Sequence, residues 1–270
     1  MRFGYAAITW GGNDLAAIDD IADGGWRGIQ LRGSAVQRWG ARPEELRTLL
    51  ARKRLSFVAL SSGVVSADPA REAETIALHV RNAEFARAAG CRFLQVVDER
   101  PRARPLVAED YRRMGRLLTE IGKRTADLGV PLGYHNHMGN LGQAPDEVAR
   151  VLEATDPGVV HLELDIAHWA AAGGDPVDAV KRYRDRLLFL HLKDLVRPAP
   201  GGTAASYQFV ELGAGTVDVR GVLGALDEIG FEGWGIVELD AVPDGVRTPR
   251  ACADASQRFL ERAGYAITGS

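Results

Sequence analysis

Residues 159–192 read VVHLELDIAHWAAAGGDPVDAVKRYRDRLLFLHL, two apolar runs on either side of an amphipathic segment. The runs at 159–166 and 187–192 have the nearly continuous apolar character of strands that are buried on both faces of a parallel sheet. Between them, Pro176-Val177-Asp178 opens a helix, with proline in the first turn and an acid beside the positive helix end. The stretch therefore predicts a parallel strand–helix–strand unit.

The same alternation continues in both directions along the chain. Further short apolar runs lie at 3–10, 28–32, 55–60, 92–97, 130–137 and 235–239. Segments with helical apolar spacing begin at 43 and 145 and extend over 70–89, 108–128, 219–229 and 249–263. Eight such units in 270 residues predict a single (β/α)8 TIM barrel, with residues 1–270 as one domain. A doubly wound open sheet is the alternative, but no GxGxxG motif follows the first strand.

One connection is much longer than the others. Residues 195–217 lie between the seventh strand and its helix and include PAPGG at 198–202. Loops of this length in compact domains often cover active sites, so we predict a lid over the barrel mouth. A surface insertion without a role in the site is the alternative.

The composition is that of an ordinary soluble globular protein. Hydrophobic residues make up 46% and charged residues 26%, and 33 Lys and Arg against 36 Asp and Glu give a net charge of −3. Without a basic excess we expect no nucleic-acid and no membrane partner. The two cysteines follow no metal-binding spacing, and neither a signal peptide nor a transmembrane run is recognisable. These features predict a cytoplasmic protein.

Four side chains that suit a metal ion stand at the ends of neighbouring predicted strands. They are His135, Asp165, His191 and Glu238, at the ends of strands five to eight. In a TIM barrel these strand ends meet at one mouth, where the chemistry takes place. Imidazoles mixed with carboxylates suit a divalent first-row ion. The alternative is that these groups are interior polar residues or helix caps with no ligand.

Five motifs then resemble a known family. They are YHNHMG at 134–139, LELDIAH at 162–168, AGGDP at 172–176, HLKD at 191–194 and EGWGIVE at 232–238. Together they resemble the xylose-isomerase-like TIM barrels, a superfamily of sugar isomerases, sugar epimerases, endonuclease IV and inosose dehydratase. The resemblance is strong over 130–240, weak over 1–125, and points in particular to the inosose dehydratase branch.

The resemblance implies a mononuclear metal site. Asp165, His191 and Glu238 fall on three of the family's four ligand positions, and His135 stands where the fourth ligand is usually a glutamate. Glu163 is the other candidate for the fourth ligand, or it orients a ligand histidine. The implied ion is Mn²⁺, with Co²⁺, Zn²⁺ or Fe²⁺ as alternatives. With His135 in place, the glutamate pair that moves protons in two-base epimerases is missing.

The implied chemistry is removal of a proton next to the carbonyl of a keto-sugar or keto-inositol. His168 or Glu238 is the predicted base, with His137 as partner, and Lys193 holds negative charge on a substrate oxygen. A solvated cation is the alternative for Lys193. If the deprotonated intermediate then loses a β-hydroxyl, the enzyme is a dehydratase, which is a lyase, and this is the favoured interpretation. If the intermediate is reprotonated instead, the enzyme is a sugar isomerase or epimerase.

Four further residues are predicted to bind substrate. Gln30 and Arg32 end the second strand, Gln95 lies in the fourth, and Trp10 either stacks on a sugar face or packs in the core. A DNA-repair nuclease is disfavoured by the net charge of −3, and a non-catalytic sugar-binding barrel is the remaining alternative. The resemblance also suggests a homodimer or homotetramer.

Overall fold

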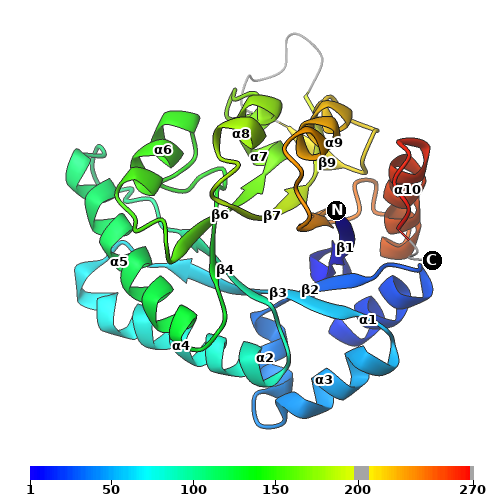
Figure 1. The fold of residues 1–270 in the computed structure, drawn as a ribbon, viewed down its shortest axis with the longest axis horizontal. Helices are drawn as coiled ribbons and strands as arrows, with labels where there is room; N and C mark the ends of the chain where they lie inside the picture. Colours follow the sequence, from blue (N-terminus) through cyan, green and yellow to red (C-terminus); the bar gives the residue numbers. More distant parts are fainter. Residues whose placement is uncertain (198–206, 268–270) are drawn as a thin grey trace.

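The computed structural model describes residues 1–197 and 207–267, and its centre is a closed barrel of parallel strands (Figure 1). The barrel closes in the order β1-β10-β7-β6-β5-β4-β3-β2. The predicted (β/α)8 TIM barrel is therefore confirmed, and each predicted strand run supplies one barrel strand. The barrel strands are β1 (Arg2–Ala6), β2 (Gly28–Arg32), β3 (Ser56–Val65), β4 (Phe93–Asp98), β5 (Leu132–His135), β6 (Val160–Asp165), β7 (Leu187–Leu192) and β10 (Trp234–Val237).

Helices surround the barrel (Figure 1). They are α1 (Asp14–Asp23), α2 (Gly33–Trp39), α3 (Pro43–Arg52), α4 (Glu72–Ala88), α5 (Ala108–Asp127), α6 (Pro145–Glu153), α7 (Ile166–Ala171), α8 (Pro176–Arg182), α9 (Val219–Glu228) and α10 (Pro249–Arg262), with 3-10 turns η1 (Ala7–Trp10) and η2 (Pro69–Arg71). Proline opens α3, α6, α8 and α10, as the sequence predicts. The sequence does not predict α1, α2 and α7. None of the described helices could span a membrane.

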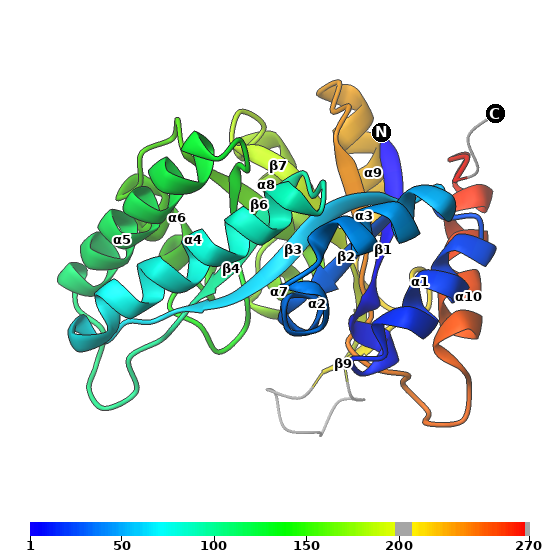
Figure 2. The same ribbon diagram turned by 90° about the horizontal axis from the view of Figure 1, so that it is seen from below.

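The first and last helices lie side by side next to β1 (Figure 2). Arg250 of α10 donates hydrogen bonds to the carbonyl oxygens of Asp20 and Asp23 at the end of α1, at 2.9 and 3.1 Å. The β1–β10 pairing closes the barrel between the same two regions. The two ends of the chain are thus joined by strand pairing and by helix contact.

An apolar layer fills the barrel near the amino ends of its strands. The rings of Phe93 and Phe189 stack there at 5.5 Å, and Val58 and Trp234 belong to the same buried cluster. Gly28 lets the strands approach, because a Cβ atom at this position would lie 2.5 Å from the Trp234 ring. This packed layer leaves the polar side chains of the strands to gather at the carboxyl ends.

The long connection after β7 begins and ends in a small antiparallel hairpin. Asp194–Val196 forms β8 and pairs with β9, which is Gln208–Val210. Residues 198–206 of the predicted lid at 195–217 lie outside the described residues. The role of this connection as a lid therefore stays a prediction.

Candidate active site

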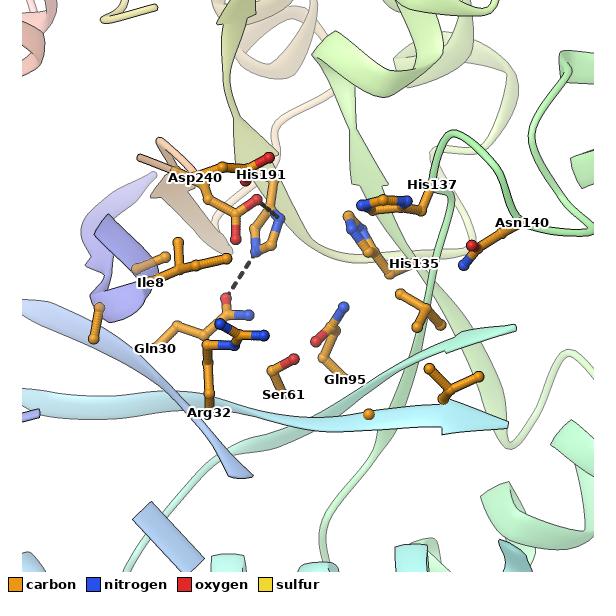
Figure 3. A pocket seen from close by; sticks show the side chains of 16 residues that line it. Ile8, Gln30, Arg32, Ser61, Gln95, His135, His137, Asn140, His191 and Asp240 are labelled. Carbon is orange, nitrogen blue, oxygen red and sulfur yellow. Dashed lines mark hydrogen bonds and ion pairs between the residues drawn. The ribbon is translucent and has the colours of Figure 1, made fainter. Parts of the chain in front are cut away.

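A cavity of about 330 Å³ opens at the carboxyl ends of the barrel strands (Figure 3). Polar side chains reach it from most of the barrel, with an apolar rim on the β1, β3 and β4 side. This is the end of the barrel at which TIM-barrel enzymes act. The side chains in its wall include Ile8, Gln30, Arg32, Ser61, Val64, Gln95, Val97, His135, His137, Asn140, His191, Glu238 and Asp240.

Three of the predicted metal ligands lie close together, and two of them, His191 and Glu238, line this cavity. Candidate ligand atoms of Asp165, His191 and Glu238 lie within 4.8 Å of one another. His191 Nδ1 is 3.7 Å from Asp165 Oδ2 and 3.1 Å from Glu238 Oε2. Asp165 Oδ2 and His191 Nδ1 are buried and have no hydrogen-bond partner among the described residues. Because unpaired buried polar atoms are unfavourable, this donor set fits a divalent cation.

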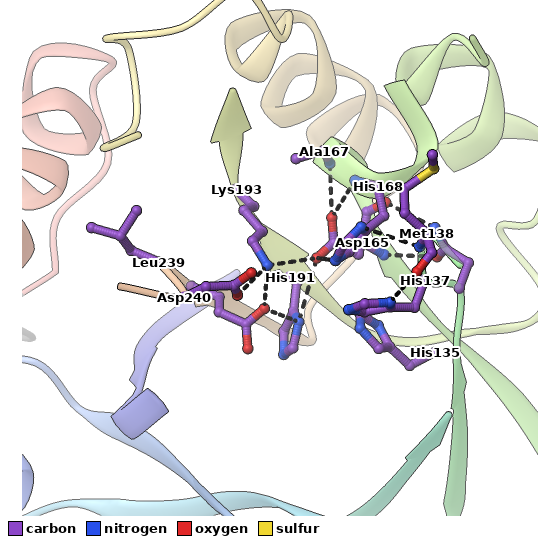
Figure 4. A network of polar contacts seen from close by, with 12 residues as sticks. His135, His137, Met138, Asp165, Ala167, His168, His191, Lys193, Leu239 and Asp240 are labelled. Carbon is purple, nitrogen blue, oxygen red and sulfur yellow. Dashed lines mark hydrogen bonds and ion pairs between the residues drawn. The ribbon is translucent and has the colours of Figure 1, made fainter. Parts of the chain in front are cut away.

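Asp165 uses its two carboxylate oxygens for different purposes (Figure 4). It is the N-cap of α7, and Oδ1 accepts hydrogen bonds from the backbone N–H groups of Ala167 and His168, both at 2.8 Å. Asn136 holds the backbone of Asp165 through both its N–H and its C=O. The cap therefore fixes the carboxylate and leaves Oδ2 to face His191.

His191 is oriented from its other side. Its Nε2 lies 2.6 Å from Glu163 Oε1 and 2.8 Å from Gln30 Oε1, so this nitrogen carries the proton. Nδ1 then faces Asp165 and Glu238, and its lone pair would be available to a metal ion that displaces the proton there, the arrangement of a metal-binding histidine backed by a carboxylate. Burial raises the pKa of Glu163 to about 7. Burial disfavours the charged form of His191, but the carboxylates of Glu163 and Glu238 raise its pKa well above the usual value.

His135 lies next to this cluster. Its ring centre is 4.9 Å from that of His191, and its Nδ1 is 3.6 Å from Glu163 Oε1. Burial holds the pKa of His135 well below its usual value, so the ring is neutral. A ring nitrogen of His135 lies within 4.8 Å of candidate ligand atoms of Glu163 and His191. Among the described residues, no such group joins His135 to both Asp165 and Glu238. The structure thus leaves both His135 and Glu163 as candidates for the fourth ligand.

The rings of His137 and His168 contact each other at a tilt of 41° beside the cluster, and the two residues differ in which ring nitrogen carries the proton. Their ring centres are 3.9 Å apart. Nδ1 of His137 lies 2.7 Å from the Met138 carbonyl oxygen and donates to it, which leaves the lone pair on Nε2. His168 Nδ1 accepts from the Met138 N–H at 3.3 Å, and burial lowers the pKa of His168 to about 3. Neutral His168 therefore carries its proton on Nε2, which lies 4.0 Å from Asp165 Oδ2.

His168, predicted as the base, and His137, predicted as its partner, are placed differently relative to the cavity. A base needs a free lone pair within reach of the substrate. His137 has one and lines the cavity, whereas His168 is 2% exposed and does not line it. His137 is therefore better placed as the base than His168.

Lys193 is buried in the site. Its side chain is 1% exposed, so the alternative of a solvated cation is wrong. Nζ lies 2.8 Å from Glu238 Oε2, 2.6 Å from Asp240 Oδ1 and 4.0 Å from the centre of the Phe209 ring. Burial opposes the charge, but the carboxylates of Glu238 and Asp165 raise the pKa of Lys193 above its usual value. The side chain is therefore a buried cation that contacts Glu238 and Asp240, two residues of the cavity wall.

The predicted substrate-binding residues divide into two groups. Gln30 and Arg32 line the cavity from β2, and Gln95 lines it from β4, the strand next to β5 (Figure 3). Trp10 does not line it, because its ring packs edge-on against Tyr5 and its Nε1 donates to Asp20 Oδ2 at 2.8 Å. Trp10 therefore packs against its neighbours, which is the alternative that the sequence left open for it.

Sequence reasoning missed several residues of the site. Ser61 and Asn140 line the cavity from β3 and from the loop after β5. Phe209 of β9 covers Lys193; it lies within the predicted lid at 195–217 but was not singled out as a site residue. Asp240 carried a signal in the sequence, because it stands two residues after Glu238, where side chains of an extended strand point to the same face.

Comparison with known proteins connects this geometry with one family. A family model described as xylose isomerase-like TIM barrel matches residues 18–263. Inosose dehydratase from Lacticaseibacillus casei is 25% identical over 276 residues, covering 90% of this chain and 91% of that protein. Inosose dehydratase from Geobacillus kaustophilus (strain HTA426) is 26% identical over 295 residues, covering 97% and 94%.

Solved structures show the same fold. The IolI protein with a bound zinc atom matches with a TM-score of 0.81 at 18% identity, over 99% of this chain and 98% of that chain. D-allulose 3-epimerase from Methylomonas sp. matches with a TM-score of 0.77 at 18% identity, over 97% and 98%. At these identities the likeness establishes the barrel fold.

Proposed function

The chain belongs to the xylose isomerase-like TIM barrel family, and from this premise we propose that it is a metal-dependent dehydratase of a keto-inositol. The relatives named inosose dehydratase support this reaction. The observation that carries it is the cluster of Asp165, His191 and Glu238, with its unpaired buried atoms facing one another at the edge of a polar cavity.

Asp165, His191 and Glu238 would hold the ion, with His135 or Glu163 as the fourth ligand. We propose Mn²⁺, with Co²⁺, Zn²⁺ and Fe²⁺ as alternatives, and the related barrel of IolI is described with a bound zinc atom. When bound, the ion supplies Lewis acidity toward the substrate carbonyl. His191 and Asp165 are held for this task by Glu163 and by the cap of α7, respectively.

The proton is moved by His137 in this proposal. Its Nε2 takes the proton next to the carbonyl, and the C–H electron pair becomes part of a new C=C bond. The C–O bond at the β-carbon breaks, and the leaving oxygen departs as water after it receives that proton from the His137 imidazolium. Lys193 Nζ stabilises the negative charge that develops on the carbonyl oxygen. His168 supports the His137 ring, and Glu238 is the alternative base.

The remaining cavity wall would bind the ring hydroxyls of the substrate. Gln30 and Gln95 present carboxamides and Arg32 presents a guanidinium. Ile8, Val64 and Val97 form the apolar rim, which suits the C–H face of a ring. The cytoplasm as compartment, and a homodimer or homotetramer as assembly, stay proposals that rest on the sequence.

An ultraviolet assay on a keto-inositol tests the function. Dehydration produces an enone-type absorption band, and epimerisation does not. We expect the band to grow with wild-type protein in the presence of Mn²⁺ and to be lost with His137→Gln. The matched control is His161→Gln, which changes a half-buried histidine that does not line the cavity.

A second measurement in D₂O separates the alternatives. Exchange of the proton next to the carbonyl, without the absorption band, would favour the sugar isomerase or epimerase. Binding of the keto-inositol with neither exchange nor absorption would favour a non-catalytic sugar-binding barrel.

A further inference from the structure

Asp240 stands in the cavity wall directly after the last barrel strand. Its side chain is 39% exposed, and it lines the cavity together with Glu238. Its Oδ1 accepts a hydrogen bond from Lys193 Nζ at 2.6 Å, shorter than the 2.8 Å contact that Nζ makes with Glu238 Oε2. Asp240 is therefore a close partner of a buried cation (Figure 4).

Lys193 contacts two carboxylate oxygens for which it would compete with a bound metal ion. Nζ lies 2.8 Å from Glu238 Oε2 and 3.8 Å from Asp165 Oδ2, and these are the two oxygens that face His191 Nδ1. An ammonium that moved closer to them would neutralise the charge that a divalent ion needs. The position of Nζ therefore matters for metal affinity, because charge interactions are strong in a buried site.

Among the described residues, three carboxylates and one aromatic ring lie around the Lys193 ammonium. The lysine stem is buried, and the ring of Phe209 covers Nζ from the β9 side with its centre at 4.0 Å. Asp240 is not a proposed ligand and draws the ammonium away from the cluster, whereas Glu238 and Asp165 draw it toward the cluster. Without Asp240, the two proposed ligands would be the remaining anionic partners within 4 Å among the described residues.

We propose that Asp240 is a positioning residue that holds the Lys193 ammonium away from the proposed ligand oxygens of Asp165 and Glu238 and thereby sets the affinity for the divalent ion. The inference rests on the proposed metal site. It gives Asp240 a role separate from those of the ligands.

A double-mutant cycle on metal-free protein tests the proposal. Co²⁺ is titrated in, and its dissociation constant is read from the visible absorption of the bound ion. We expect Asp240→Asn to weaken Co²⁺ binding about tenfold, because the ammonium then pairs with the ligands, and Lys193→Met to tighten it. The double variant should bind Co²⁺ like Lys193→Met, because Asp240 acts through Lys193.

Two further variants keep the test decisive. Asp240→Glu retains the carboxylate and should restore most of the affinity. Asp185→Asn removes an exposed charge just before β7, at the opposite end of the barrel, and should change nothing. Thermal unfolding of each variant identifies any that fails to fold.

The outcomes separate this proposal from the proposed function. If wild-type protein binds no Co²⁺, the metal site itself is wrong. If wild-type protein binds Co²⁺ and Asp240→Asn weakens binding equally with and without Lys193, Asp240 contributes only its charge and the positioning role is wrong. Unchanged affinity in Asp240→Asn would contradict the proposal as well.

Discussion

At the scale of single residues, the site depends on which nitrogen or oxygen each side chain presents. One carboxylate oxygen of Asp165 caps α7, and the other faces the cluster. Nε2 of His191 contacts Glu163 and Gln30, and its Nδ1 faces the cluster. Each side chain is thus held by one atom while another stays available. This is the arrangement expected of groups that must bind an ion without reorganising.

Glu163→Gln tests the orienting role of Glu163. The amide can still contact His191, but it lacks the charge that makes the imidazole a better ligand. We expect metal affinity to fall by about 10- to 100-fold, measured with a competing chelator. Glu228→Gln, which changes an exposed partner of Lys181, is the control. Wild-type affinity in Glu163→Gln would mean that Glu163 is a passive interior group.

His137→Gln tests the assignment of the base. The amide keeps the size of the side chain but cannot take a proton, so we expect kcat to fall at least about 100-fold. Metal content should stay at the wild-type level, because His137 is not among the proposed ligands. A larger loss in His168→Gln than in His137→Gln, with the metal retained, would reverse the two roles.

At the scale of elements, Asp194 ties the two ends of the long connection together. This fully buried carboxylate accepts backbone N–H groups from Leu195, Gly213, Gly215 and Val217 at 2.8 to 3.0 Å. A Cβ atom at Gly215 would lie 2.2 Å from Asp194 Oδ1, so the loop can close this tightly only with glycine there. These four hydrogen bonds hold the β8–β9 hairpin, which places Phe209 over Lys193.

Asp194→Asn should weaken this set of hydrogen bonds. The amide nitrogen of asparagine would face two backbone N–H groups that now donate to a carboxylate oxygen. We expect the free energy of unfolding to fall by about 3 kcal/mol, measured by urea denaturation. Asp185→Asn serves again as the exposed control. A loss as small as that of the control would show that the loop closes without the carboxylate.

His79 of α4 links its helix to the cavity wall. Its Nδ1 lies 2.7 Å from Ser62 Oγ and its Nε2 lies 3.3 Å from the Val64 carbonyl oxygen, and β3 carries both partners. Burial lowers the pKa of His79 from 6.5 to about 4. The imidazole is therefore neutral in the folded chain at neutral pH.

This shift makes stability depend on pH. Between pH 6.5 and about 4 the unfolded chain binds a proton at His79 that the folded chain does not. The free energy of unfolding should therefore be fully retained above pH 6.5 and fall as the pH drops to about 4, by on the order of 3 kcal/mol. Urea denaturation at several pH values measures this, and His79→Asn should show a shallower decline. Equal slopes would contradict the assignment.

At the scale of the whole molecule, the barrel could be predicted because parallel strands buried on both faces must be apolar. The short helices α2 and α7 could not, because their seven and six residues are too few to show a period. His135, Asp165, His191 and Glu238 could be found because strand ends converge. The proton positions of His137 and His168, and the cover by Phe209, depend on contacts that the sequence does not encode locally.

Metal content tests the central claim most directly. Protein purified without chelator is analysed by elemental mass spectrometry beside His191→Ala, which removes the histidine between Asp165 and Glu238. The account expects about one Mn, Co, Fe or Zn ion per chain in the wild type and loss of the ion in the variant. Wild-type protein that holds no ion, even after incubation with Mn²⁺ and Co²⁺, would contradict it.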